Sequence, residues 1–548
     1  MVVPTAPAQD VAQPVRRTPG PRAAWALRLV AVIAAGFALY AGSPPREAWW
    51  VAPLAIAVLG AVVRHRSARA GFGYGVVFGF AFLLPLLGWL QDFLGADFGP
   101  WPWLGVAAVE ALFIGLAGAG MALVSRLPVA PVWMAAVFVT AESVRSAFPF
   151  GGFPWGRLAF TQDTGPMLSL AAIGGATLVS FAVALAGSGL AELIGRAGLI
   201  GRAGLIGRAG LIGRAGLIGR AGLIRAPRRW AVPVAAIAVP LLGGLACWPL
   251  VGTDANAGTK RVAIIQGNAP NLGLGLLYED DVLHDNHVRA AEELVDDVQA
   301  GRVPKPDFVL FPEQVGSWGP ARSDPELSAI ASRLGVPLIV GGLGQDRDQQ
   351  LRNEIVRWDP ETGFGDRYVK QHLVPFAETI PMREVARLVS PFVDRFQSDM
   401  VPGDDPGVLD VAGLKLGVGI CYDVAYDDVF GPAAAEGATL LAVPTNNAWY
   451  GHSEMSYQQL AMSRLRAVET GRAVLVGATS GVSAVVAPDG SVAARTELFT
   501  EQNLVAEVPL RSNRTWATEL GSVPMWTLAV LGVGAIAAAG WRARKSGA

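Results

Sequence analysis

The sequence has little charge for its length. Only 16% of its 548 residues are charged and 52% are hydrophobic, whereas a soluble domain carries about 25% charge. This deficit excludes a purely soluble enzyme. The formal net charge is −1 and no part of the chain forms a basic domain, so a nucleic-acid-binding function is not expected.

Cysteine and histidine are also scarce. The two cysteines, Cys247 and Cys421, exclude a disulfide-rich scaffold and a cysteine-cluster metal site. The five histidines show no ligand spacing such as HExxH, and no GxxxxGK[ST] phosphate loop is present. We therefore expect no metal and no cofactor.

Long apolar runs fill the chain from about residue 24 to 250 and return near its end. Each run approaches the ~20 residues that cross a bilayer as a helix. The second run is short, and the fifth contains Glu142 and Arg145, which are unusual within a membrane. The runs predict eight spanning helices, at 24–43, 46–63, 71–90, 104–125, 129–147, 167–190, 230–250 and 523–541.

The distribution of basic residues predicts how these helices are oriented. The outer loops, 91–103 and 148–166, contain a single basic residue, Arg157. Cytoplasmic loops are normally the ones enriched in Lys and Arg, so we expect both termini inside and residues 251–520 outside the cytoplasm. The basic residues assigned to the inside are Arg16, Arg17, Arg22, Arg64, Arg66, Arg69, Arg126, the arginines of 195–229, Arg542, Arg544 and Lys545.

Six segments follow from these patterns: a disordered tail (1–23), a bundle of six spans (24–194), a cytoplasmic loop (195–229), a seventh span (230–250), an outer domain (251–520), and the eighth span with the C-terminus (521–548).

The cytoplasmic loop contains five consecutive copies of GRAGLI at 195–224. An arginine every six residues excludes a membrane span, and two glycines per copy disfavour a helix. We interpret it as a tolerated repeat expansion; an arginine-rich surface for anionic lipid headgroups is the alternative.

The outer domain alternates short apolar strands with helical patterns. Helices are expected at 283–299, 325–334 and 454–470. Continuous apolar strands between helices are typical of an α/β layered domain whose sheet is covered on its faces. The expected strands are 261–266, 307–312, 337–342, 414–421, 438–444, 473–479 and 482–488.

Three reactive side chains, Glu313, Lys370 and Cys421, each follow an apolar strand in this domain. Taken singly, they are an ordinary loop carboxylate, a surface ammonium and a buried thiol. Together they supply a nucleophile, a base for its proton and a cation for an oxyanion. No histidine lies in a partner motif, so a Cys-His protease is less favoured, and Cys247 lies within a span as a packing residue.

The motifs FPEQ (311–314), YVKQHLVPFAE (368–378) and GICYD (419–423) resemble the Glu-Lys-Cys signature of the nitrilase, or carbon-nitrogen hydrolase, superfamily. The combination of eight spans with such a domain resembles the architecture of the apolipoprotein N-acyltransferase family. Further matches to that family are AIIQGNAP (263–270), FPFGGFPWGRLAFTQ (148–162), NNAWYGHS (446–453) and the stretch 458–492.

The resemblance implies an αββα nitrilase-like domain and a two-step acyl transfer in the bacterial inner membrane. A phospholipid such as phosphatidylethanolamine would acylate Cys421, and the α-amine of a diacylglyceryl-cysteine at an apolipoprotein N-terminus would accept the chain. Glu313 would be the general base, Lys370 the oxyanion stabiliser and Glu378 a supporting glutamate. No cofactor is implied, and nothing requires more than a monomer.

Five further residues are expected to bind substrate. The aromatic loop 148–162 lies on the same side as the outer domain, so we expect it to line the lipid entrance with Trp155 at the membrane interface; simple aromatic-belt anchoring is the alternative. Tyr422 and Asp423 adjoin the nucleophile. Trp449 and Tyr450 either cover the acyl chain or pack the domain.

Some positions depart from the family pattern. Asp423 stands where Glu is usual, Ala377 where Gly is usual and Asn447 where Asp is usual. Two other functions therefore stay open: a membrane-bound amidase or nitrilase that transfers the acyl group to water, and an inactive scaffold for a lipid-processing partner. A hydrolase would need no lipoprotein acceptor, which distinguishes it from the transferase.

Overall fold

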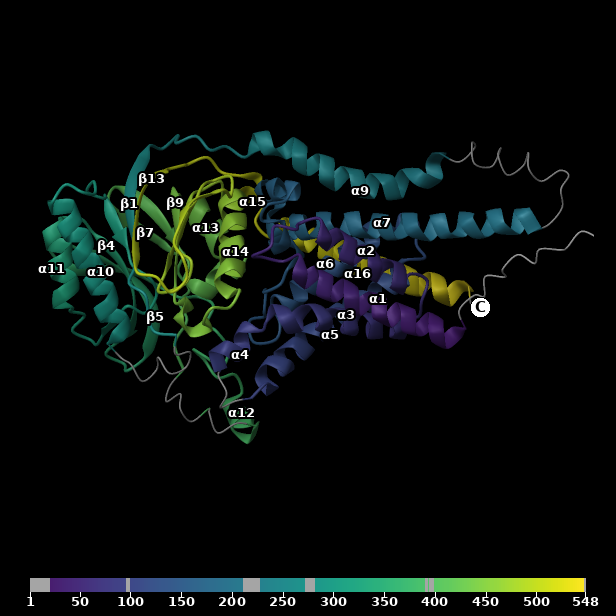
Figure 1. Cartoon of the computed structure of the whole chain (residues 1–548), viewed down its shortest axis with the longest axis horizontal. Helices are drawn as coiled ribbons and strands as arrows, with labels where there is room; N and C mark the ends of the chain where they lie inside the picture. Colours follow the sequence, from purple (N-terminus) through teal and green to yellow (C-terminus); the bar gives the residue numbers. More distant parts are fainter. Residues whose placement is uncertain are drawn as a thin grey trace, which may run out of the picture.

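Apolar helices form one half of the molecule and an α/β domain is seated on one end of them (Figure 1). The computed structural model describes residues 20–94, 99–209, 227–271, 281–389, 393 and 399–546. Most of the predicted N-terminal tail, residues 1–19, lies outside them. The bundle helices are α1 (Pro21–Ala41), α2 (Val51–Val63), α3 (Ala68–Leu86), α4 (Trp89–Leu94), α5 (Trp101–Val124), α6 (Ala130–Arg145), α7 (Ala171–Ala209), α9 (Pro227–Cys247) and α16 (Val523–Ser546).

Small residues let the bundle helices approach closely. A Cβ added to Gly71 of α3 would lie 2.4 Å from the carbonyl oxygen of Gly118 in α5, and one added to Gly118 would lie 2.4 Å from that of Gly71. Glycine at both positions therefore permits backbone contact, which is the usual basis of helix packing in membranes.

Six of the eight predicted spans are matched by helices that are long and apolar enough to cross a membrane. The other two runs also form helices, but α2 has 13 residues and α6 has 16, both shorter than the ~20 of a full span. The structure thus shows six candidate spans among the described residues, and the count of eight stays a prediction.

The charges in the fifth run point into the bundle. The Arg145 guanidinium donates hydrogen bonds to Glu110 Oε2 (3.2 Å) and to the Trp155 carbonyl oxygen (2.7 Å). Glu142 Oε1 accepts one from the Leu158 N–H at 2.8 Å. These buried groups are paired, as burial of charge requires, and they hold the loop 148–158 against the helices.

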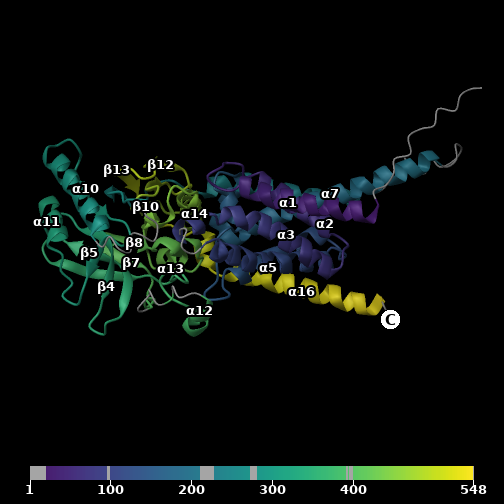
Figure 2. The same cartoon turned by 60° about the horizontal axis from the view of Figure 1, so that its bottom comes forward.

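The prediction that the GRAGLI repeats form a loop is wrong for residues 195–209, which continue α7. Extending an existing helix avoids the cost of nucleation, and the Arg, Ala and Leu of each copy are good helix formers despite its glycines. The extension projects beyond the other bundle helices (Figure 2). The repeat residues 210–224 lie outside the described residues.

The outer domain contains two sheets. The first has the order β13-β1-β2-β4-β5-β6, with β3 paired to β4; the second has the order β12-β11-β10-β9-β8-β7. Their strands are β1 (Thr259–Gln266), β2 (Phe308–Leu310), β3 (Gly316–Trp318), β4 (Leu338–Gln345), β5 (Leu351–Asp359), β6 (Gly363–Val369), β7 (Val408–Val411), β8 (Leu414–Val418), β9 (Leu440–Thr445), β10 (Val474–Ala478), β11 (Ala484–Val486), β12 (Val492–Arg495) and β13 (Gln502–Pro509).

Helices cover the outer faces of both sheets, as the sequence predicts. Apolar side chains such as Ile264, Leu416 and Leu440 fill the space between the sheets. Helices α10 (Val282–Gln299) and α11 (Pro325–Leu334) pack on the first sheet, whereas α13 (Phe430–Ala435) and α14 (Met455–Thr470) lie on the side that faces the bundle (Figure 1). Two short helices, α12 (Arg383–Val389) and α15 (Trp516–Leu520), complete the domain.

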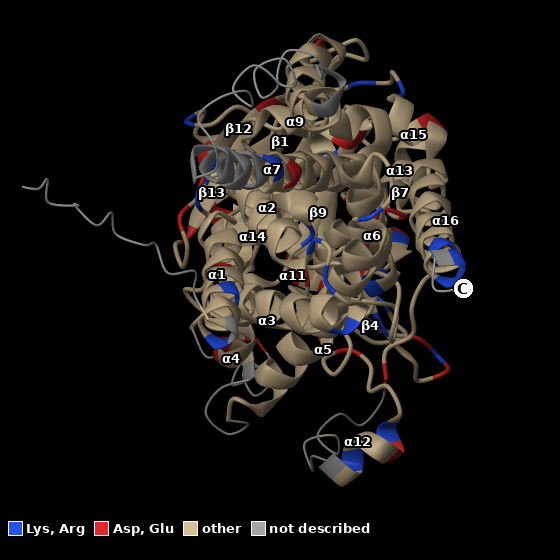
Figure 3. Ribbon diagram, turned by 90° about the vertical axis from the view of Figure 1, so that its right-hand side faces the viewer, with Lys and Arg blue, Asp and Glu red and all other residues tan. Residues whose placement is uncertain are grey.

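The seven predicted strands and three predicted helices of this domain are confirmed within a few residues, and β3, β5, β6, β7, β12 and β13 were not predicted. The C-terminus lies at the end of the bundle remote from the α/β domain (Figure 1). Figure 3, seen from that end, shows Lys and Arg gathered at the end of α16, where the last turn contains Arg544 and Lys545.

Candidate active site

Three of the predicted catalytic side chains meet at the sheet edges. Glu313 follows β2 and Lys370 follows β6, and both are almost fully buried. Lys370 Nζ lies 3.0 Å from Glu313 Oε1 and 3.0 Å from Glu378 Oε1. The ammonium is therefore held between two carboxylates, which is the arrangement that lets a buried cation stay charged.

A fourth residue, Asn353 of β5, completes this cluster and was not predicted. Its Nδ2 donates hydrogen bonds to Glu313 Oε1 (2.6 Å) and Glu378 Oε1 (2.7 Å). The two carboxylate oxygens thus share both the Asn353 amide and the Lys370 ammonium. Glu313 Oε2 accepts a further hydrogen bond from the Asn446 N–H at 2.8 Å, so the orientation of the carboxylate is fixed.

Cys421 stands at a sharp turn after β8. It is the first residue of the 3-10 helix η7 (Cys421–Ala425), and its φ is +48°, a left-handed conformation that costs a non-glycine residue of order 1 kcal/mol or more. The Asp423 carboxylate holds this turn by accepting hydrogen bonds from the Ile420 N–H (2.9 Å), the His372 N–H (3.0 Å) and the Tyr368 hydroxyl (2.9 Å). In this structure Asp423 therefore positions Cys421 and does not face an open substrate site.

The electrostatic setting keeps the thiol neutral and the amine charged. Burial, reinforced by the Glu313 carboxylate and opposed by the Lys370 ammonium, raises the pKa of the Cys421 thiol to about 12. Burial acts to lower the pKa of Lys370, but the carboxylates of Glu313 and Glu378 outweigh it and hold the pKa well above its usual range. The resting species are thus a neutral Cys421 thiol and a charged Lys370 ammonium.

Two polar residues from other elements touch or adjoin the sulfur. Gln459 of α14 lies with its Nε2 at 3.6 Å from Cys421 Sγ, and the Thr445 side chain, at the end of β9, acts to lower the pKa of the thiol. Neither residue was among the predicted site residues, because neither lies in a motif with a reactive side chain.

The prediction that Trp155 lies at the membrane interface is wrong, because its side chain is only 1% exposed. Its indole is stacked near Tyr422, with ring centroids 6.4 Å apart, and its Nε1 donates to Gln458 Oε1 at 2.6 Å. The Tyr422 hydroxyl in turn donates to the Gly152 carbonyl oxygen at 3.3 Å. The loop 148–158 therefore packs under the nucleophile turn and joins it to the bundle.

Trp449 and Tyr450 contact the bundle through helix α4. The Tyr450 ring lies edge-on to Trp89 at 5.1 Å, and Trp449 lies edge-on to Phe93 at 6.1 Å. Burial raises the pKa of Tyr450 well above its usual range, and the neighbouring Cys421 and Glu313 add to the effect. Tyr450 is thus close to Cys421 and Glu313, and packing explains both rings without a ligand.

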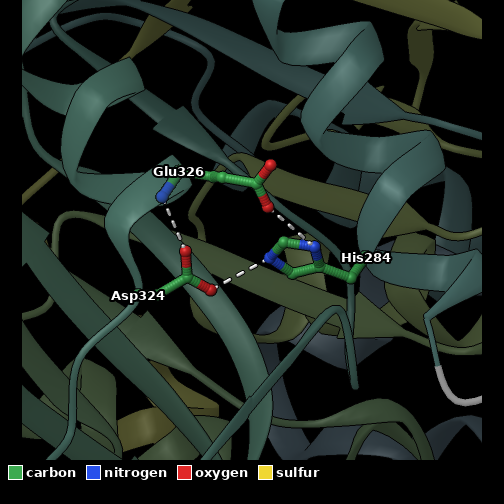
Figure 4. Close-up of side chains that lie close together, drawn as sticks. All are labelled: His284, Asp324 and Glu326. Atoms are coloured by element: carbon green, nitrogen blue, oxygen red, sulfur yellow. Dashed lines mark hydrogen bonds and ion pairs between the residues drawn. The ribbon is translucent and has the colours of Figure 1, made fainter.

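One further cluster, His284, Asp324 and Glu326, brings together side chains of metal-binding type (Figure 4). The two ring nitrogens of His284 face different carboxylates, with Nε2 at 2.9 Å from Asp324 and Nδ1 at 3.4 Å from Glu326. Both carboxylates favour a protonated ring that donates from each nitrogen, and hydrogen bonding to Asp324 raises the pKa of His284. The geometry is that of an ion-paired imidazolium that joins α10 to α11.

Comparisons with known proteins agree with this architecture. Residues 35–189 match the family described as apolipoprotein N-acyltransferase N-terminal domain, and residues 262–518 match the carbon-nitrogen hydrolase family. The apolipoprotein N-acyltransferase of Mycolicibacterium smegmatis is 40% identical over 519 residues, which cover 92% of this chain and 84% of that protein. The one from Chromobacterium violaceum is 27% identical over 552 residues, covering 94% and 95%.

Among solved structures, Saccharomyces cerevisiae Nit3, a member of branch 10 of the nitrilase superfamily, is similar to the outer domain. It is 19% identical, with a TM-score of 0.34, and the match covers 49% of this chain and 95% of Nit3.

Proposed function

Because this chain belongs to the apolipoprotein N-acyltransferase family, we propose that it transfers the acyl group in two steps through a thioester on Cys421. The acyl donor is a phospholipid of the phosphatidylethanolamine type. The acceptor is the α-amine of a diacylglyceryl-cysteine at the N-terminus of an apolipoprotein. The observation that carries the proposal is the cluster of Glu313, Lys370 and Glu378, joined by contacts of 3.0 Å, beside the buried thiol.

In the first step Glu313 removes the thiol proton as the sulfur attacks the ester carbonyl. A thiol with a pKa of about 12 is almost never ionised at neutral pH, so the proton leaves during the attack and not before it. The C–O bond of the phospholipid then breaks, and the departing alkoxide takes the proton back from Glu313. The products are the thioester and a lysophospholipid.

Lys370 stabilises the negative oxygen of the tetrahedral intermediate. Its ammonium is fixed by Glu313 and Glu378, so it needs no reorganisation when charge develops. Backbone N–H groups at the start of η7, next to Cys421, add donors of the kind found at helix N-termini. Glu378 keeps the ammonium in place, and its own Oε2 is held by the Val374 N–H at 2.8 Å.

In the second step the amine attacks the thioester carbonyl. Glu313 accepts a proton from the attacking nitrogen, the C–S bond breaks, and the proton passes to the departing sulfur. The amide is formed and the thiol is restored. A thioester is higher in free energy than an amide, so transfer of the acyl group from Cys421 to the amine is favourable without an external energy source.

We place the reaction at the outer face of a bacterial inner membrane. Both substrates are anchored by acyl chains, and moving a lipid far from the bilayer would cost about 0.8 kcal/mol for each CH₂ exposed. The outer domain adjoins the bundle through α14, with Gln458 Nε2 donating to the Leu86 carbonyl oxygen at 3.2 Å. We propose eight crossings, with cytoplasmic termini, and a monomer as the working unit.

The catalytic thiol is 5% exposed, so substrate must reach it by displacement of side chains that cover it. We propose that the loop 148–162 and the rings of Tyr422, Trp449 and Tyr450 flank the path of the acyl chain. Trp155 supports this path from below, in keeping with its burial.

The purified protein, incubated with phosphatidylethanolamine and a diacylglyceryl-cysteine peptide, tests the proposal. We expect a peptide heavier by one acyl chain, with the added chain on its α-amine by fragment mass analysis, for the wild type and for Cys247→Ala. Cys421→Ala is expected to give none. Release of free fatty acid without an acylated peptide would support the alternative that the protein is a hydrolase. No turnover of the lipid would support the alternative that it is an inactive scaffold.

A further inference from the structure

We propose that Gln459 is a catalytic residue, whose side-chain amide donates a hydrogen bond to the Cys421 sulfur whenever that sulfur carries negative charge. The inference rests on the proposed function, since it takes Cys421 as the nucleophile. Gln459 lies on α14, is 1% exposed, and places Nε2 at 3.6 Å from Cys421 Sγ.

Two neighbours fix which end of the Gln459 amide faces the sulfur. The carbonyl oxygen Oε1 accepts hydrogen bonds from the Thr445 hydroxyl at 3.1 Å and from Asn447 Nδ2 at 2.9 Å. With two donors on Oε1, the NH₂ group is the end left for the sulfur. A reversed amide would place an NH₂ group against the Asn447 NH₂ group, and two donors repel each other.

The same contact gives a reason for an amide side chain at Asn447. A carboxylate at this position has no hydrogen to donate to Gln459 Oε1, whereas the Asn447 amide has two. Asn447 and Gln459 therefore act as a pair: the first orients the second, and the second reaches the thiol.

Helix α14 is tied to the nucleophile turn, so the Gln459 donor is held in place. Arg466, two turns along the same helix, donates hydrogen bonds to the Val424 carbonyl oxygen (2.9 Å) and the Ala425 carbonyl oxygen (3.0 Å) at the end of η7. A donor that is fixed before the reaction stabilises developing charge without reorganisation.

The chemical role follows from when the sulfur is charged. The hydrogen bond is weak to a neutral thiol or thioester and stronger to a sulfur that is becoming a thiolate. Sulfur gains negative charge as Glu313 removes its proton in the first step, and again as the C–S bond breaks in the second. Gln459 therefore favours both transition states over the resting states, which is the condition for a catalytic contribution.

The test uses the full-length protein in detergent, in a Cys247→Ala background so that Cys421 is the only thiol. The rate constant for alkylation by iodoacetamide is measured by intact mass between pH 7 and 9.5. We expect Gln459→Met to react about tenfold more slowly than the parent, as for loss of a hydrogen bond to a charged group. Gln459→Glu, which replaces the donor by a carboxylate, should be slower still.

Thr470→Val is the matched control. It removes a different buried hydrogen bond of α14, from the Thr470 hydroxyl to the Arg466 carbonyl oxygen at 2.8 Å, far along the helix from the sulfur. We expect it to leave the alkylation rate unchanged. Asn447→Asp, which retains Gln459 but removes the donor that orients it, should slow alkylation in the same direction as Gln459→Met.

The rate of thioester formation from phospholipid, measured in the same variants, gives a second readout. Gln459→Met reacting at the parent rate in both assays would overturn the role of Gln459 and leave the proposed function intact. A parent protein that is neither alkylated at Cys421 nor acylated by phospholipid would overturn the proposed function itself. The two failures are thus distinguishable.

Discussion

Replacing Glu313 by Gln removes the proposed general base but keeps the shape of the side chain. The thiol pKa of about 12 leaves roughly one Cys421 in 10⁵ ionised at pH 7, and forming the free thiolate costs about 7 kcal/mol. Transfer of the proton to Glu313 during the attack avoids that free thiolate. Loss of a positioned general base typically lowers a rate by 10²–10⁴, so we expect thioester formation by Glu313→Gln to fall about 10³-fold at pH 7.

The pH dependence of the variant is the sharper part of this prediction. Without the base, the reaction depends on the small fraction of thiolate, which rises tenfold with each pH unit as long as the pH stays below the thiol pKa. The rate of Glu313→Gln should therefore climb about tenfold per unit between pH 7 and 9.5, and the wild-type rate should change much less.

The assay is rapid mixing with phospholipid micelles, acid quenching and intact mass measurement of the acyl-enzyme. Glu354→Gln is the matched control, because Glu354 is the next residue to Asn353 on β5, is fully buried and binds Trp318 and Arg367. It should keep a rate near that of the wild type. A Glu313→Gln variant with a flat pH profile, or with the wild-type rate at pH 7, would show that Glu313 is not the base for the thiol proton.

Three further changes have defined outcomes. Asn353→Leu removes the amide that Glu313 and Glu378 share and leaves them only the Lys370 ammonium as a shared donor. We therefore expect kcat for acyl transfer to fall by about 10- to 100-fold; normal kcat with a normal Tm would contradict this. Trp155→Ala empties a buried site and should destabilise the protein by about 3–5 kcal/mol, seen as a lower Tm in detergent, with acyl transfer reduced; unchanged transfer would rule out its part in the lipid path. His284→Gln should lower Tm at pH 6 but hardly at pH 9. The folded state raises the pKa of His284 above 6.5, so the protonated ring stabilises the fold below pH 6.5, and this stabilisation is lost as the pH rises through the folded-state pKa. An equal loss of Tm at both pH values would contradict the ion-pair assignment.

Glu313 and Cys421 could be predicted because each follows a predicted apolar strand, whereas Lys370 was predicted from its motif, since the strand before it, β6, was not predicted. Glu313, Lys370 and Glu378 do come together, and the strands before Glu313 and Cys421 lie where their apolar runs predict them. An apolar run and a reactive residue next to it are local features of the sequence, so they can be recognised without knowledge of the fold.

The partners of those residues were not readable in this way. Asn353 lies on β5, whose sequence contains no continuous apolar run. Gln459 contacts the sulfur from α14, and it lies 38 residues after Cys421 in the sequence. Their roles depend on which side chains the two sheets and α14 bring together. The prediction that Trp155 lies at the membrane interface was wrong for the same reason. An aromatic-rich sequence does not indicate whether a ring contacts lipid or other side chains, and the Trp155 ring contacts Tyr422 and Gln458.

The GRAGLI repeats show the limit of local propensity. Their glycines argue against a helix, yet residues 195–209 continue α7, because a helix that has already formed extends at little cost. The helices α2 and α6 are both shorter than their predicted spans: α2 begins at Val51, where the span was predicted to begin at residue 46, and α6 ends at Arg145, where the span was predicted to end at residue 147.

Intact mass spectrometry of the purified protein in phospholipid micelles shows whether Cys421 carries the acyl chain. We expect a mass gain of one acyl chain on the wild type and on Cys247→Ala, removed by hydroxylamine, and no gain on Cys421→Ala. A hydroxylamine-labile acyl chain that persists on Cys421→Ala would contradict it. So would a wild type that acylates the diacylglyceryl-cysteine peptide while no thioester forms at any time after mixing.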